Sequence, residues 1–94
     1  AGSLTVDSGA VKALTEQHAS LLPVGCIRAD GHFHRGELVA ILDTDGKEIA
    51  RGLTNYSSGE TAKILRTPSE RIAEKLGYAH EDELIHRDNM ASHR

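Results

Sequence analysis

The most conspicuous candidate for chemistry is a polar stretch near the end of the chain, His86-Arg87-Asp88-Asn89. Its first three residues spell the tripeptide of the protein-kinase catalytic loop, where the aspartate orients the substrate hydroxyl and an asparagine five residues later holds magnesium. Here the residue five positions after Asp88 is His93, and the asparagine is the immediate neighbour. The glycine-rich phosphate loop, the strand lysine and the DFG motif are also missing from the sequence. The stretch is therefore predicted to be the polar end of a strand and not a catalytic loop.

Histidine and cysteine are the other residue types that could do chemistry in this chain. His32 and His34 flank Phe33, and in an extended segment their side chains would point the same way, as two metal ligands could. No cysteine or carboxylate completes the set at a suitable spacing, so a solvated pair is predicted. Cys26 is the one cysteine, and its apolar segment predicts a buried, unreactive thiol. The residues thus predict no catalytic group, no metal ligand and no cofactor-binding residue.

Composition sets the class of protein. The chain has 94 residues, of which 38% are hydrophobic and 27% charged, as is typical of one small globular domain. No apolar run is long enough to cross a membrane, so no membrane partner is expected. A single cysteine fits a reducing compartment, and a cytoplasmic location is expected. The net charge of −3, with only one Phe and two Tyr, argues mildly against nucleic-acid binding.

Two helix starts are visible in the sequence. Asp7 or Ser8 can cap a helix whose apolar residues share one face. Ser57 is followed three residues later by Glu60, which is a capping box and predicts a second helix. The apolar residues of the two helices are Ala10, Val11, Ala13 and Leu14 in the first, and Ala62, Ile64 and Leu65 in the second.

A third helix is predicted from Thr67-Pro68-Ser69-Glu70, which spells a further capping box. Proline stands at its first helical position, where the missing N–H has no partner to lose. Ile72 and Leu76 then share a face, and Gly77 is expected to end the helix in the left-handed conformation.

Strand patterns fill the middle of the chain. Residues 20–30 are apolar and partly β-branched, and residues 37–55 hold two apolar runs joined by Asp45-Gly46, the pair that suits a type I′ hairpin turn. In residues 38–42 both alternating sets are apolar, so both faces of that strand are predicted to be buried. Burial of both faces in so small a domain favours a closed or nearly closed barrel.

Short strands at residues 4–6 and 84–86 complete the expected fold. The prediction is an α+β protein, a small mixed β pseudo-barrel with three short helices, in which residues 1–94 form a single domain.

An ordered set of motifs links the chain to a known family: VDSGAVKAL, SLLPVG, RGELVAI, GKEIARGLTNYSSGE and LGYAHEDELIHRDNM. Together they resemble the C-terminal PUA domain of the glutamate 5-kinase family, over residues 4–90. PUA domains are small α+β pseudo-barrels, which agrees with the pattern of elements. His18 stands where members of this family commonly carry glycine; if the position requires the left-handed conformation, histidine can adopt it at modest cost.

The resemblance implies a function for a longer protein. Its members transfer the γ-phosphoryl of ATP, with magnesium, to the side-chain carboxylate of L-glutamate, the first step toward proline. The residues responsible lie in an amino-acid-kinase domain that precedes the PUA domain, so the 94 residues are expected to be inactive alone. The implied partner is that kinase domain, in an enzyme that is a homo-oligomer.

Two roles for the domain stay open. One is a regulatory or assembly role, which would affect feedback by proline or the oligomeric state. The other is RNA binding, which the resemblance also implies, with Gly9, Lys12, Arg35 and Arg51 as the candidate residues. The acidic net charge favours regulation over RNA binding.

Overall fold

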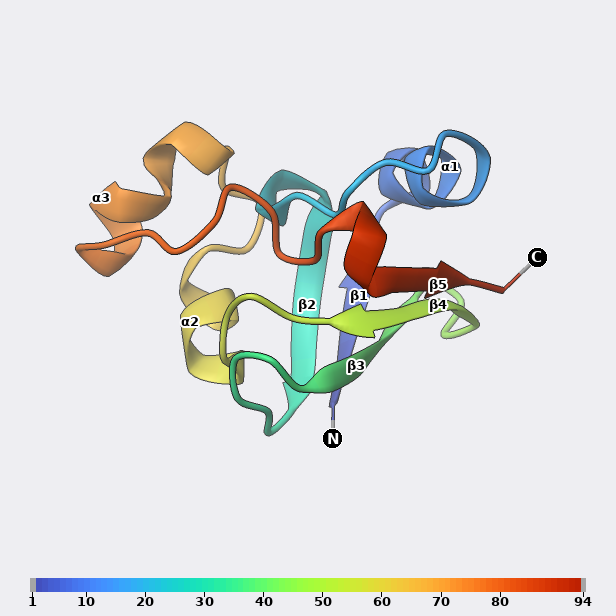
Figure 1. The fold of residues 1–94 in the computed structure, drawn as a ribbon, viewed down its shortest axis with the longest axis horizontal. Coiled ribbons are helices and arrows are strands. Elements are labelled where there is room, and N and C mark those ends of the chain that lie inside the picture. Colours follow the sequence, from blue (N-terminus) through green and yellow to red (C-terminus); the bar gives the residue numbers. More distant parts are fainter. Residues whose placement is uncertain (1, 94) are drawn as a thin grey trace.

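Five strands form one mixed sheet in the order β2-β1-β3-β4-β5 (Figure 1). The computed structural model describes residues 2–93. The strands are β1 (Gly2–Val6), β2 (Cys26–Gly31), β3 (Leu38–Leu42), β4 (Glu48–Leu53) and β5 (Met90–Ser92). The helices are α1 (Ser8–Glu16), α2 (Ser58–Lys63) and α3 (Ile72–Leu76), with 3-10 turns at Pro23–Gly25, Ser69–Arg71 and Arg87–Asn89.

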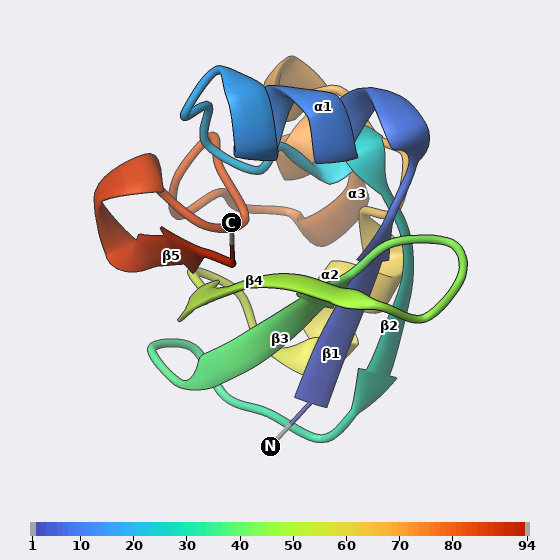
Figure 2. The same cartoon turned by 90° about the vertical axis from the view of Figure 1, so that its right-hand side faces the viewer.

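The sheet confirms the predicted α+β class with three short helices, but it does not close. β1 pairs antiparallel with β2 and parallel with β3, and β4 is antiparallel to both β3 and β5. β2 and β5 lie at opposite edges of the sheet and do not pair with each other. The strongly twisted strands give a pseudo-barrel shape while leaving one face open (Figure 2).

The prediction that β3 is buried on both faces is wrong. Val39 and Ile41 are buried in the core, whereas Leu38, on the opposite face, is 49% exposed. Leu14 of α1, Ile72 of α3 and Ile64, which directly follows α2, belong to the same core cluster as the inward-facing strand residues. The helices therefore cover a single face, and an all-apolar strand could not show which face that would be.

The β3–β4 hairpin forms at the predicted place with a different turn. Asp43 N–H donates to the Lys47 carbonyl (2.9 Å) and Gly46 N–H donates to the Asp43 carbonyl (3.0 Å), which closes a three-residue loop. Gly46 has a φ of 85°, but Asp45 is not among the residues with positive φ. A type I′ turn needs positive φ at both central residues, so that prediction is wrong. The Asp43 carboxylate accepts from Asp45 N–H and Lys47 N–H (2.9 Å each) and stabilises the longer loop.

Two of the three predicted helix starts are confirmed. Asp7 is the residue that caps α1, because its Oδ1 accepts from Ala10 N–H at 2.8 Å. The capping box of Ser57 and Glu60 is present at α2 with both of its hydrogen bonds. These caps form within four residues, so the sequence alone can specify them.

The capping box predicted at residues 67–70 is wrong. Thr67 is buried and its hydroxyl donates to the Leu65 carbonyl (3.2 Å), while the Ser69 hydroxyl donates to the Asp82 carbonyl (2.7 Å). The chain makes a 3-10 turn at Ser69–Arg71 before α3 begins. Gly77 ends α3 with a φ of 85°, as predicted.

The strand predicted at residues 84–86 is also wrong. Leu84 and Ile85 are fully buried, and Ile85 makes only an isolated bridge to Leu21. The polar tripeptide follows in a 3-10 turn, where His86 Nδ1 accepts from Asp88 N–H at 3.1 Å. The last strand is β5, which begins at Met90.

The segment predicted as strand at residues 20–30 is strand only from Cys26 onward, because Pro23 begins a 3-10 turn. Within residues 2–93, no helix is long and apolar enough to cross a membrane.

Candidate binding site

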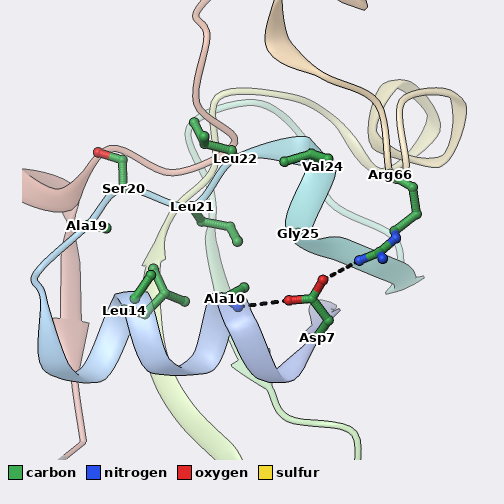
Figure 3. Close-up of a pocket in the computed structure, with 11 residues that line it drawn as sticks. Asp7, Ala10, Leu14, Ala19, Ser20, Leu21, Leu22, Val24, Gly25 and Arg66 are labelled. Carbon is green, nitrogen blue, oxygen red and sulfur yellow. Dashed lines mark hydrogen bonds and ion pairs between the residues drawn. The ribbon is translucent and has the colours of Figure 1, made fainter.

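A hollow of about 320 Å³ lies between α1 and the segment of residues 19–25 (Figure 3). It is open to solvent on one side. The lining residues are Asp7, Ala10, Ala13, Leu14, Ala19, Ser20, Leu21, Leu22, Val24, Gly25 and Arg66.

Small side chains on α1 create the hollow. Ala10 and Ala13 line it from the helix, whereas Leu14 and Leu21 are buried and belong to the core beneath it. At the rim, Leu22 is 41% exposed. The walls are therefore mainly aliphatic, which suits an apolar group better than a phosphate.

The chain turns sharply after α1 to build the opposite wall. His18 adopts the left-handed conformation with a φ of 54°, which histidine can adopt at modest cost. Ala19 N–H then donates to the Ala13 carbonyl (3.2 Å). Further on, a Cβ at Gly25 would lie 2.9 Å from the Ala10 Cβ, so the close approach of this segment to α1 requires glycine.

An ion pair forms the polar end of the hollow. The Asp7 carboxylate caps α1 through Oδ1 and accepts from Arg66 through Oδ2. The hydrogen bond from Ala10 N–H, followed by the one from Arg66, lowers the pKa of Asp7 below its ordinary value. The backbone N–H of Arg66 donates to the carbonyls of Pro23 (3.0 Å) and Cys26 (3.1 Å), which holds the main chain at this residue. The guanidinium is paired with the Asp7 carboxylate, which balances its charge.

The four candidate RNA-binding residues lie in separate places. Gly9 and Lys12 are exposed on α1, which follows the Val6 end of β1. Arg35 is in the loop between β2 and β3, at the Gly2 end of β1, since Gly2 pairs with Gly31 and Val39. Arg51 on β4 donates to Glu48 through Nε (2.7 Å) and Nη2 (3.2 Å). The structure places no common groove around all four, and their role stays a prediction.

The other candidates for chemistry are built for different roles. His32 and His34 are exposed, with ring centroids 5.1 Å apart, and no cluster of three metal-ligating side chains occurs among residues 2–93. Cys26 is fully buried, and desolvation raises the pKa of its thiol to about 11. The predicted burial of this thiol is confirmed, and a raised pKa disfavours the reactive thiolate.

A polar cluster at the far end of the molecule was not predicted from the sequence. The Tyr56 hydroxyl donates to the Glu81 carbonyl (2.6 Å) and accepts from the backbone N–H groups of His80 (2.9 Å) and Glu81 (3.2 Å). Glu60 Oε2 accepts from the Tyr78 hydroxyl and lies 3.3 Å from His80 Nε2. The partners in these contacts are 18 to 25 residues apart, so only the fold brings them together.

Comparison with known sequences connects this chain to one family. The sequence model described as "PUA domain" matches residues 2–76. Two similar curated proteins are both named glutamate 5-kinase: one from Laribacter hongkongensis (52% identical over 98% of this chain) and one from Saccharophagus degradans (62% over 95%). The chain spans only 24% to 25% of the length of these relatives.

Two solved structures are similar to the fold. A PUA domain from Aeropyrum pernix, solved as a tartrate complex, has a TM-score of 0.66 and 26% identity, and the match covers 90% of this chain and 41% of that one. A chain of the archaeal box H/ACA sRNP Nop10–Cbf5 complex has a TM-score of 0.59 and 25% identity, over 64% of this chain and 19% of that one.

Proposed function

The chain belongs to the PUA domain family, and from this premise we propose that it is the C-terminal, non-catalytic module of a glutamate 5-kinase. The observation that carries the proposal is identity of 52% to 62% over nearly the whole chain to proteins of that name. Residues 1–94 then form the single PUA domain of the enzyme.

The remaining three quarters of the proposed enzyme hold the chemistry. An amino-acid-kinase domain precedes the PUA domain and, with ATP and magnesium, phosphorylates the side-chain carboxylate of L-glutamate. Such a transfer needs positioned groups and charge neutralisation around the phosphates. The enzyme is a cytoplasmic homo-oligomer in this proposal, and the kinase domain is the module's partner.

Within that enzyme, the module regulates activity or supports assembly. The mainly aliphatic hollow beside α1 and the spread of cationic side chains over separate elements favour contacts with protein. The net charge of −3 also favours a protein partner over a polyanion.

Deletion of residues 1–94 from the full-length protein tests this role. Catalysis of ATP-dependent glutamate phosphorylation should survive, while inhibition by proline or the sedimentation coefficient should change. Unchanged inhibition and unchanged assembly would refute the regulatory and assembly role. A full-length protein without glutamate-dependent ATP turnover would refute the parent activity.

RNA binding is the second candidate, favoured by the similarity to a chain from a ribonucleoprotein complex. The affinity for a structured RNA pool should then fall steeply with salt, because phosphate contacts release counterions. Lys12→Ala and Arg35→Ala should each weaken binding and reduce the salt slope by about one. No salt-sensitive binding by the full-length protein would exclude this candidate.

A further inference from the structure

Two leucines stand opposite each other on the open face of the sheet. Leu38 of β3 pairs directly with Leu53 of β4, and the two are 49% and 43% exposed. We propose that this pair, the Leu38–Leu53 surface, is where the module packs against the preceding kinase domain of the same polypeptide. This inference rests on the proposed function.

Leucine at these two positions contributes little to the core of the module. Val39 is buried in the core, and a Cβ at the buried Gly52 would lie 2.6 Å from the side chain of the core residue Ile85. The alternation of the pleat therefore turns both leucines outward. No helix lies over this side of the sheet in Figure 2. The solvated face of an antiparallel pair normally carries polar residues, so an apolar cross-strand pair there indicates a covering partner.

The topology places this surface beside the entry of the chain. Gly2 opens β1 and pairs with Val39, the residue next to Leu38. Figure 1 shows the N-terminal end of β1 beside the beginning of β3. In the proposed enzyme the kinase domain is connected through this end, so its surface is brought to the Leu38–Leu53 surface.

The small size of the surface also favours a partner that is covalently joined to the module. A separate protein or a second copy generally needs more than about 1,000 Å² of buried area to bind stably. Two half-exposed leucines supply only a small part of that. A covalently joined domain is present at an effective concentration of the order of millimolar, and a small apolar contact then suffices.

The polar surroundings fit the rim of such a contact. On the same face of β4, Arg51 is one step along from Leu53 in the pleat and is already paired with Glu48. A partner that covers the leucines therefore need not supply a charge for Arg51. The expected counterpart on the kinase domain is a small apolar patch.

The test uses the full-length protein and the rate at which a protease cuts the segment that joins the two domains. Leu38→Ser with Leu53→Ser should speed this cleavage about tenfold, because loss of the apolar contact raises the population of undocked molecules. The control is Ile27→Ser, at an aliphatic residue of similar exposure (41%) on the edge strand β2, which is separated from β3 by β1 and does not line the hollow; it should leave the rate unchanged.

Two further measurements keep the outcomes separate. The urea midpoint is measured for each variant, including the single variant Leu38→Gln. Faster cleavage with an unchanged midpoint indicates undocking, whereas faster cleavage with a lowered midpoint indicates unfolding of the module. Equal cleavage rates in wild type and the leucine variant would overturn the proposal, as would equal acceleration by Ile27→Ser. A smaller sedimentation coefficient with unchanged cleavage would assign the surface to a second copy and also overturn it. Glutamate-dependent ATP turnover of the same protein is measured independently. Its absence would refute the proposed function, whereas the cleavage rates test only the Leu38–Leu53 surface.

Discussion

The two ends of the molecule close their loops in different ways. Near α3, the buried Tyr56 hydroxyl joins the loop of residues 78–82 to the end of β4 through three hydrogen bonds. Beside α1, aliphatic walls enclose an open hollow, with the ion pair of Asp7 and Arg66 as its main polar contact. Figure 1 shows these helices at opposite ends of the long axis.

The difference indicates that the Tyr56 end stabilises the fold, whereas the end with the hollow can bind a partner. Buried polar groups are costly unless all are satisfied, so the Tyr56 end leaves little freedom for change. An aliphatic hollow open to water tolerates substitution and gains stability when something apolar enters it.

The largest effect is expected at the Tyr56 end. Tyr56→Phe should lower the free energy of unfolding by about 2 kcal/mol, because the backbone N–H groups of His80 and Glu81 lose their acceptor. Urea unfolding followed by circular dichroism measures the change. Tyr78→Phe is the matched control at an exposed hydroxyl and should have little effect; equal losses in both variants would remove the distinction.

A smaller effect is expected at the polar end of the hollow. Asp7→Ala should cost about 1 kcal/mol because α1 loses its cap. Asp7→Asn retains a capping oxygen and loses only a partly exposed ion pair, so it should cost a few tenths of a kcal/mol. Denaturant midpoints of the two variants separate cap from charge, and equal costs would show that the ion pair dominates.

Acid should affect both ends in the same direction. The pKa of Asp7 is lowered by its hydrogen bonds to Ala10 N–H and Arg66. At Glu60, burial acts to raise the pKa, but the hydrogen bonds from Tyr78 and Ser57 outweigh it and the pKa is lowered. Carboxyl groups with depressed pKa stabilise the fold above their ordinary pKa values of 3.8 and 4.5, and this stability is lost as the pH falls through the folded-state values.

Unfolding midpoints measured at a series of pH values test this expectation. The midpoint should fall below about pH 4, and Asp7→Asn should make the fall less steep. A variant with the same pH dependence as wild type would show that Asp7 makes no contribution.

The smallest effect is expected inside the hollow. Ala13→Leu should change the free energy of unfolding by no more than about 0.5 kcal/mol, because the new side chain enters open space. Ala50→Leu is the matched control in the fully buried core and should cost about 1–3 kcal/mol by overpacking. Similar costs at both positions would mean that the hollow is closed in solution.

Local sequence patterns predicted most of the helices and turns, but they did not predict which faces are buried or which distant residues are in contact. The caps at Asp7 and Ser57 and the left-handed Gly77 were predictable because each depends on atoms within a few residues. The capping box predicted at residues 67–70 follows the same pattern as the one at Ser57. It fails because the buried Thr67 hydroxyl donates to the Leu65 carbonyl and the chain makes a 3-10 turn at Ser69–Arg71.

The candidate site was only partly predictable. The family resemblance marked His18 as a departure from glycine, but only the structure showed its left-handed conformation. The residues of the hollow could not be predicted, because alanines and leucines carry no chemical signal. The nominated Lys12 and Arg35 proved to lie at opposite ends of β1, which depends on strand pairing and not on spacing along the chain.

The sequence by itself determined the α+β class, the family, two of the three helix starts and the position of the β3–β4 hairpin, since these follow from local hydrogen bonds and motif order. Only the tertiary structure decided which face of β3 is open, that Leu84 and Ile85 enter the core without forming a strand, and that Tyr56 meets His80. The physical reason is sequence separation. Contacts between residues more than about twenty positions apart depend on how the sheet twists and which face the helices cover, and no short pattern encodes either.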